Sequence, residues 1–257
     1  IYQTPGLCYD FDTVQISIHP NPEIDIFINQ EKPCLGSEIT VENNSTNLNN
    51  ETFVWSVNDS LYSSDSEPIF LLEMGTHNIS VLVVNQYGCK NTQEYYETFN
   101  IYDTAALPSP EIIRSTVIND MDVYTEWDAK ETFTNVAKEF VLFKSTDQIS
   151  YEYITTLEHD VNYYTDVDVD VYSENYTYYI VSFNQCDVPS SASNISSSVL
   201  LGYDKPNEFQ TQLKWTSYEK WKNGVNRYEI QKLNEFGQWE VIKVVNHNVE
   251  NTIIDAE

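Results

Sequence analysis

Three aspartates that alternate along one short stretch are the residues of this sequence best placed to do chemistry. Asp166, Asp168 and Asp170 lie in the run TDVDVDVYSENYTYYIV, residues 165–181. Carboxylate oxygens are ligands for hard cations such as Ca²⁺, and alternate residues of an extended chain point to the same side. The run lacks the central glycine and distal glutamate of an EF-hand loop. A solvated acidic edge is therefore the favoured interpretation, and weak calcium binding is the alternative.

The other reactive side chains do not form a recognisable catalytic set. The four histidines, His19, His77, His159 and His247, are scattered, and no serine or cysteine lies in a nucleophile motif. The sequence contains no glycine-rich phosphate loop. Among 40 acidic residues, any two carboxylates chosen as a glycosidase pair would be arbitrary. We therefore predict a non-enzymatic chain that uses no cofactor.

Charge and hydropathy exclude two classes of partner. A chain with a net charge of −27 is repelled by nucleic-acid phosphates and by an anionic membrane surface. No apolar run approaches the length needed to cross a bilayer, and residues 81–84 are typical of the longest. Residue 1 is an isoleucine and no signal peptide is recognisable, so we expect a piece of a longer chain.

Short runs in which apolar and polar residues alternate dominate the sequence. This period of two indicates half-buried β-strands, and abundant Tyr, Thr, Val and Ile favour the same conformation. The apolar positions of four such runs are Val14, Ile16 and Ile18; Ile24, Ile26 and Ile28; Phe53, Trp55 and Val57; and Ile79, Val81 and Val83. Proline-containing stretches at 19–22, 106–110 and 203–206 indicate linkers. The predicted fold is all-β, a series of β-sandwiches.

An internal repeat relates two parts of the chain. Trp127 and Trp215 lie 88 residues apart, and two further pairs of segments keep that offset. The pairs are residues 140–144 with 228–232 and 151–154 with 239–242, and residues 163–166 match 252–255 at an offset of 89. A repeat of this length indicates duplicated domains. The second copy reaches Glu257 before its last strands, and without them it would expose a sheet edge and half a core.

These segments resemble known families. Residues 123–127, 140–144, 164–166 and 176–180 are similar to strands B, C, E and F of a fibronectin type III domain. The run YTYYIVSFNQC at 176–186, with SSAS at 190–193 and VLL at 199–201, resembles a subgroup found in large surface proteins of Bacteroidota. That subgroup has glycine at the position of Asp187.

A second resemblance covers the preceding part of the chain. Residues 32–41, 53–55, 67–68, 74–75 and 79–89 are similar to a PKD domain of the same kind of protein. The usual Gly-Asp-Gly is replaced by SVND at 56–59. Together the resemblances imply the end strand of a preceding Ig-like or PKD-like unit at 1–20, a PKD-like domain at 21–105, a fibronectin type III domain at 106–202, and the N-terminal part of a second at 203–257.

The resemblance also implies a location and partners. Proteins of this kind are exported by the type IX secretion system, and they include gliding adhesins and multidomain enzymes with β-sandwich stalks. The implied location is the exterior of the bacterial outer membrane. The implied partners are the secretion machinery, other outer-membrane surface proteins or a surface polysaccharide. The expected function is adhesion or gliding motility through serial spacers, and the alternatives are an accessory stalk of a secreted hydrolase and a glycan-binding module.

Secretion would permit disulfides. Cys34 and Cys89 lie at opposite ends of the PKD-like unit, and we expect them to form a disulfide. Closing a loop of this length would stabilise the fold by about 3–4 kcal/mol in the chain-entropy treatment. Cys8 and Cys186 are left either to pair outside the chain or to stay free.

Several aromatic residues are expected in the cores. The mid-strand positions of Trp55, Trp127 and Trp215 favour core packing over a role as ligand platforms, whereas Trp221 and Trp239 are candidate contact residues near loops or edges. Tyr176 and Tyr178 should share the inward face of one strand, and one of them should form the tyrosine corner that pins the E–F connection.

Three triplets resemble the O-glycosylation signal of Bacteroidota. They are Asp12-Thr13-Val14, Asp59-Ser60-Leu61 and Asp103-Thr104-Ala105. Ser60 and Thr104 lie in predicted loops and are the preferred candidates. Thr13 has the alternative of simply starting a strand.

Overall fold

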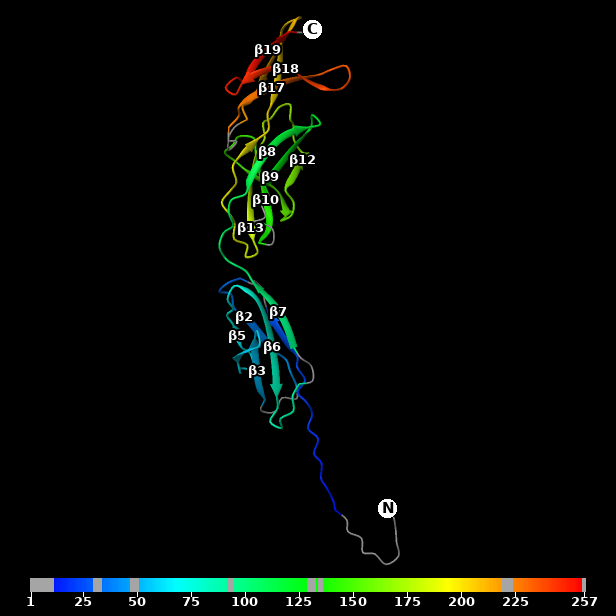
Figure 1. Cartoon of the computed structure of the whole chain (residues 1–257), viewed down its shortest axis with the longest axis vertical. Coiled ribbons are helices and arrows are strands. Elements are labelled where there is room, and N and C mark those ends of the chain that lie inside the picture. The colour runs from blue at the N-terminus through cyan, green and yellow to red at the C-terminus, as the bar shows by residue number, and fades with distance from the viewer. Residues whose placement is uncertain are drawn as a thin grey trace, which may run out of the picture. The chain divides into compact units, whose positions relative to one another are not determined.

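The computed structural model describes residues 12–29, 34–46, 51–91, 95–128, 133, 136–218 and 224–255. The regular secondary structure of these residues is β-strand, and the pairings between the named strands are antiparallel. No helix among them is long and apolar enough to cross a membrane. The chain divides into two compact units, Ile1–Tyr102 and Asp103–Glu257 (Figure 1). The all-β fold predicted from the sequence is confirmed.

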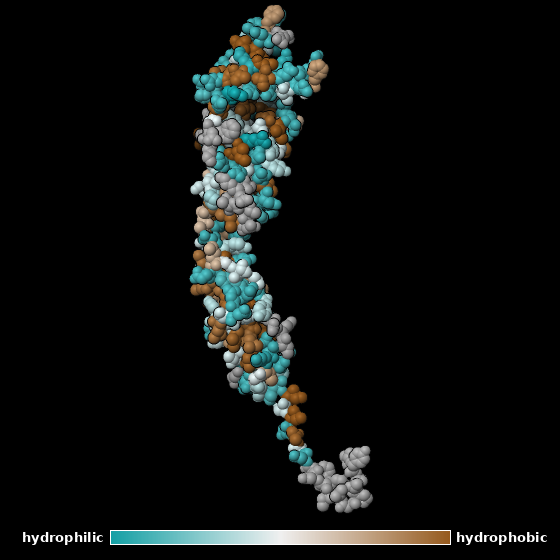
Figure 2. All heavy atoms as spheres, in the orientation of Figure 1, coloured by the Kyte–Doolittle hydropathy of each residue, from teal (hydrophilic) through white to brown (hydrophobic). Residues whose placement is uncertain are grey.

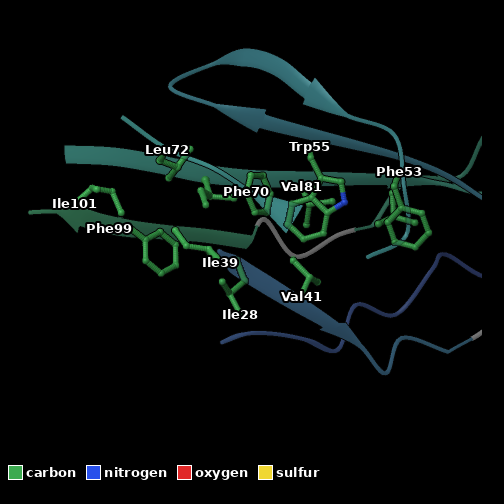
Figure 3. Packing of buried hydrophobic residues seen from close by; sticks show 12 residues of the cluster. Ile28, Ile39, Val41, Phe53, Trp55, Phe70, Leu72, Val81, Phe99 and Ile101 are labelled. Atoms are coloured by element: carbon green, nitrogen blue, oxygen red, sulfur yellow. The ribbon is translucent and has the colours of Figure 1, made fainter. Parts of the chain in front are cut away.

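The first unit is a sandwich of two sheets with strand orders β1-β2-β5 and β4-β3-β6-β7. Side chains that alternate along these strands meet in one core, in which Trp55 and Phe70 are fully buried (Figure 3). Their rings meet edge to face with centroids 5.5 Å apart. The strands are β1 (Ile26–Asn29), β2 (Ile39–Asn43), β3 (Thr52–Val57), β4 (Ser60–Ser63), β5 (Ile69–Phe70), β6 (Gly75–Val84) and β7 (Tyr95–Ile101).

The second unit begins with another sandwich, whose sheets have the orders β12-β9-β8 and β11-β10-β13-β14. Alternation is clearest in β9, where every second residue is buried. Trp127, Phe140 and Leu142 are fully buried in its core. The strands are β8 (Glu111–Ile118), β9 (Asp122–Asp128), β10 (Ala137–Ser145), β11 (Glu152–Glu158), β12 (Tyr163–Asp166), β13 (Thr177–Asn184) and β14 (Ser196–Ser197).

The same unit ends with two smaller sheets, β15-β16-β19 and β17-β18. Their strands are β15 (Leu201–Asn207), β16 (Gln210–Trp215), β17 (Arg227–Leu233), β18 (Trp239–Asn246) and β19 (Asn251–Asp255). By the 88-residue repeat, β17 is the counterpart of β10. β10 pairs with β11 and β13, whereas β17 pairs with β18 alone among the described residues. Among the described residues, one edge of β17 therefore has no strand beside it. Figure 2 shows apolar side chains at the surface of this part of the chain.

Two sequence predictions about organisation are wrong. The alternating residues Val14, Ile16 and Ile18 do not form a strand, and they are 77, 79 and 89% exposed. An alternating pattern becomes a strand only where a neighbouring strand accepts its hydrogen bonds, and no described residue does so here. The expected linker at 203–206 instead lies within β15, where Pro206 coincides with a register shift that tolerates its missing N–H.

Candidate functional site

The acidic stretch takes part in a buried ion pair. Asp166, the last residue of β12, is 2% exposed. Its Oδ2 accepts a hydrogen bond from Tyr178 Oη at 3.0 Å and lies 3.1 Å from Lys144 Nζ. Because Lys144 and Tyr178 come from neighbouring strands of the facing sheet, the three side chains join the two layers of the sandwich. We call this group the inter-sheet triad.

The remaining contacts of the inter-sheet triad satisfy its polar groups. Burial in the core, reinforced by the Asp166 carboxylate, raises the pKa of Tyr178 far above its ordinary value, so its hydroxyl stays protonated and donates. Lys144 Nζ also donates to the backbone oxygen of Asp168 at 3.3 Å and lies 5.5 Å from the centre of the Tyr176 ring. A buried charge supported in this way avoids the large cost of an unpaired one.

Tyr176 forms the predicted tyrosine corner. Its hydroxyl accepts a hydrogen bond from the backbone N–H of Asp170 at 2.8 Å and so pins the connection between β12 and β13. The Asp170 carboxylate in turn accepts from the backbone N–H of Tyr172. Tyr176 and Tyr178 share the buried face of this segment with Ile180, as predicted.

The three aspartates do not converge. Asp168 and Asp170 are exposed, as expected of a solvated edge, but that prediction is wrong for Asp166. The described residues contain no group of three or more His, Cys, Asp or Glu side chains that could hold a metal ion. Because Asp166 is held by Lys144 and Tyr178, the geometry does not support the alternative of a calcium site at this stretch.

The expected disulfide between Cys34 and Cys89 is wrong. Cys34 and Cys186 are each disulfide-bonded, whereas Cys89 is a free thiol. Cys34 lies beside the Gly75 end of β6 and Cys89 lies just past its Val84 end. A ten-residue strand spans about 33 Å, and a disulfide requires Cα atoms within about 7 Å. The two cysteines therefore lie at opposite ends of the sandwich, too far apart to form a disulfide with each other.

The structure places three of the predicted tryptophans in cores and one at the surface. Trp55 and Trp127 are fully buried and Trp215 is 9% exposed, which confirms their place in the cores. Trp239 is 67% exposed. In the repeat it matches Tyr151, whose ring packs 4.7 Å from Tyr179 of β13. The part of the chain that the structure describes has no counterpart of β13 beside Trp239, which accounts for its exposure. Cys8 and Trp221 lie outside the described residues.

Aromatic rings also gather on the outer face of the sheet β11-β10-β13. Phe143 and Tyr179 stack with centroids 4.8 Å apart and an interplanar angle of 16°. Tyr153 meets the edge of Phe143. Each ring of this pair has one face against the other ring, an arrangement that stabilises neighbouring strands of a sheet.

The three candidate glycosylation residues are all exposed. Thr13 lies in the unpaired segment and does not start a strand. Ser60 is not in a loop as predicted: it is the first residue of β4, directly after a turn in which Asn58 and Asp59 both have positive φ. Thr104 is in a loop, where Asp103 Oδ1 accepts a hydrogen bond from the N–H of Ala105.

Sequence reasoning missed a turn that is built three times. At Asn85, Asn184 and Asn234 the side-chain Oδ1 accepts hydrogen bonds from the backbone N–H groups two and four residues later, at 2.9–3.0 Å. The residue three positions later has positive φ, and it is Gly88, Asp187 or Gly237 respectively. We call this the asparagine turn. Asn followed three residues later by Gly or Asp is a signal, but a weak one in an Asn-rich chain.

Three serines on either side of β14 form hydrogen bonds with β13 and with the residue just before it. Ser190, Ser193 and Ser198 each donate a backbone N–H to a carbonyl oxygen, and each Oγ accepts the N–H of the same residue. Their partners are Ser182, Ile180 and Tyr176 respectively. Hydroxyls thereby replace the backbone carbonyls of a regular ladder, which explains why β14 is only two residues long.

Comparison with known proteins shows likeness of structure only. No protein-family model matches the chain, and no curated protein matches it. Among solved structures it is similar to domains A168–A170 of titin, with 12% identity, a TM-score of 0.41, and coverage of 63% of this chain and 59% of that one. Fibronectin(III)-like modules of Clostridium thermocellum CbhA give 12% identity and 0.39, covering 68% and 93%. The FN1–FN3 domains of chicken CNTN1 give 8% and 0.34, covering 90% and 87%.

Proposed function

We propose that this chain is a non-enzymatic, extracellular segment of a surface protein, in which serial β-sandwiches act as spacers. The observation that carries the proposal is that Asp166 has a structural role. The residue best placed for chemistry in the sequence holds two sheets together through Lys144 and Tyr178. The disulfide-bonded Cys34 and Cys186 favour an oxidising compartment outside the cytoplasm.

The finer parts of the proposal rest on the sequence resemblance. They are a PKD-like first unit, a bacterial surface protein of the Bacteroidota type, export by type IX secretion, and a role in adhesion or gliding. The partners proposed on that basis are the secretion machinery, other outer-membrane surface proteins or a surface polysaccharide. In the alternative of a hydrolase stalk, the same sandwiches would carry a catalytic domain encoded elsewhere in the gene.

A substitution of whole domains tests the spacer function. In the full-length protein, residues 21–202 would be replaced by two unrelated β-sandwiches of similar length, and a second strain would lack these residues altogether. Surface display would be measured by antibody labelling, and attachment by counting cells retained under flow. A spacer predicts that the replacement keeps attachment and the deletion reduces it. If the replacement loses attachment as fully as the deletion while display is normal, the segment makes specific contacts and the proposal fails.

A further inference from the structure

Two of the asparagine turns hold the chain segment that leads into their own sandwich. In the first unit, Asn85 Nδ2 donates to the backbone oxygen of Pro20 at 3.0 Å. In the second unit, Asn184 Nδ2 donates to the oxygens of Ala105 at 2.9 Å and Asp103 at 3.3 Å. Pro20 precedes β1 by six residues, and Ala105 precedes β8 by six residues. The same kind of contact is thus made six residues before the first strand of a sandwich in each of the two units.

The third asparagine turn differs in this one respect. Asn234 Nδ2 donates to the Glu240 side chain, within the β17–β18 hairpin that contains the turn. The Oδ1 contacts are alike in all three turns, so they serve to build the turn. The Nδ2 contacts differ, and at Asn85 and Asn184 they reach 65 and 79 residues back along the chain.

We propose that Asn85 and Asn184 are positioning residues, each of which locks the lead-in segment of its sandwich onto the turn. Their side chains are well suited to this because Asn85 is 7% and Asn184 3% exposed, so water does not compete for the amide hydrogens. One amide group satisfies two backbone N–H groups through Oδ1 and one or two backbone carbonyls through Nδ2. A lead-in segment held in this way forms part of the sandwich rather than a free linker.

Neighbouring contacts strengthen the lock in both units. In the first, the His19 ring stacks on Tyr87 of the same turn, with centroids 3.5 Å apart and an interplanar angle of 6°. In the second, Ser109 Oγ donates to the backbone oxygen of Ala192 at 2.7 Å. Each of these contacts holds the lead-in segment to its sandwich at a second point.

The inference deepens the proposed spacer function and rests on it only for the biological purpose of the lock. Fixed lead-in segments make the distance from each junction to its sandwich invariant, which is what a spacer requires. The lock itself is tested without reference to function, so its failure and the failure of the spacer proposal are separate results.

Amide hydrogen exchange of the whole chain, read by mass spectrometry, tests the lock. Asn184→Asp retains the Oδ1 acceptor, removes the Nδ2 donor and places a carboxylate against two carbonyl oxygens. We expect exchange of the Ala105 N–H, which donates to Asp103 Oδ1, to become about tenfold faster in a peptide covering residues 103–110, while β9 peptides stay unchanged. Asn85→Asp should do the same for residues 18–24. Asn234→Asp is the matched control, because it introduces the same charge into the same turn without a lead-in contact.

The outcomes are decisive in either direction. The proposal is supported if each of the first two variants loosens only its own lead-in segment. It is overturned if residues 103–110 exchange at the original rate in Asn184→Asp, or if Asn234→Asp loosens them equally. Should Asn184→Asp unfold its whole sandwich, the Asn85→Asp variant in the separate first unit decides by the same criteria.

Discussion

Removing one hydroxyl from the inter-sheet triad is the sharpest test of how the second unit is held together. Tyr178→Phe keeps the fully buried ring and deletes the group that donates to Asp166 at 3.0 Å. Lys144 remains 3.1 Å from the carboxylate, so the charge stays paired. The substitution therefore reports the hydrogen bond with little disturbance of packing.

The magnitude follows from the charge of the acceptor. Hydrogen bonds to charged groups contribute about 1.5–3 kcal/mol, and burial of both partners places this one near the middle of that range, about 2 kcal/mol. At a urea m-value of about 1.5 kcal/mol/M, the unfolding midpoint of this sandwich should fall by about 1.3 M. Lys144→Met leaves the Asp166 charge buried without its cation and should cost more, about 3–5 kcal/mol.

The assay must report on one sandwich, because the chain divides into two compact units and a single transition cannot be assumed for the whole chain. Hydrogen exchange of β9 and β10 peptides across a urea series provides that local midpoint. Tyr153→Phe is the control, since it deletes the hydroxyl of a residue that is 60% exposed and bonds only Thr156 within the described contacts. The reasoning is refuted if Tyr178→Phe shifts the midpoint no more than Tyr153→Phe does.

Four further predictions concern other parts of the chain. Alkylation of the native, unreduced protein should modify Cys89 and leave Cys34 and Cys186 unmodified; mass spectrometry reporting a protected Cys89 would contradict the assignment. Asp120→Gly should stabilise the second unit by about 0.5–1 kcal/mol, because Asp120 has a φ of 57° in the β8–β9 turn, and Asp120→Ala should not; urea midpoints compare them. Backbone hydrogen bonds from Ser150 and Ile149, together with one from the Ser145 hydroxyl, lower the pKa of Asp147 to about 2. The stabilising contribution of Asp147 is therefore complete above the unfolded pKa of about 3.9 and is lost as the pH falls towards 2. An NMR titration of the Asp147 carboxyl with an ordinary midpoint would refute this. Calcium at millimolar concentration should leave the urea midpoint of the second unit unchanged, and a rise that Asp168→Asn abolishes would restore the cation site.

The features that the sequence predicted correctly are those that depend on local pattern. Alternation placed β3 and β6, and the repeat and the resemblance placed β9. The mid-strand positions of Trp55 and Trp127 then assigned them to the cores, because a two-residue period decides which side chains face inward. The tyrosine corner was also foreseeable, since Tyr176 and Asp170 are only six residues apart. In these cases the contact and its sequence signal lie within one or two elements.

The features that were missed depend on partners distant in the sequence. The burial of Asp166 requires Lys144, which reaches it from the opposite sheet. The cysteine pairing failed because strand length, not domain membership, sets the distance between Cys34 and Cys89. The strand predicted around Ile16 was wrong because an alternating pattern forms a strand only beside another strand. The role of Asn184 could not be predicted from the sequence, because the carbonyl groups to which it donates lie 79 and 81 residues away.

The inter-sheet triad also bears on how the sandwich responds to a pulling force. Lys144 and Tyr178 belong to one layer and Asp166 to the other. When the layers slide or peel apart, the carboxylate and the ammonium group therefore lose each other before water has fully hydrated either charge. That early energetic cost opposes gradual loosening, and the domain should hold its full length until it yields in one step. Stiffness against small loads, followed by abrupt extension, is the mechanical property that a buried ion pair between layers gives to a sandwich built mainly from apolar contacts.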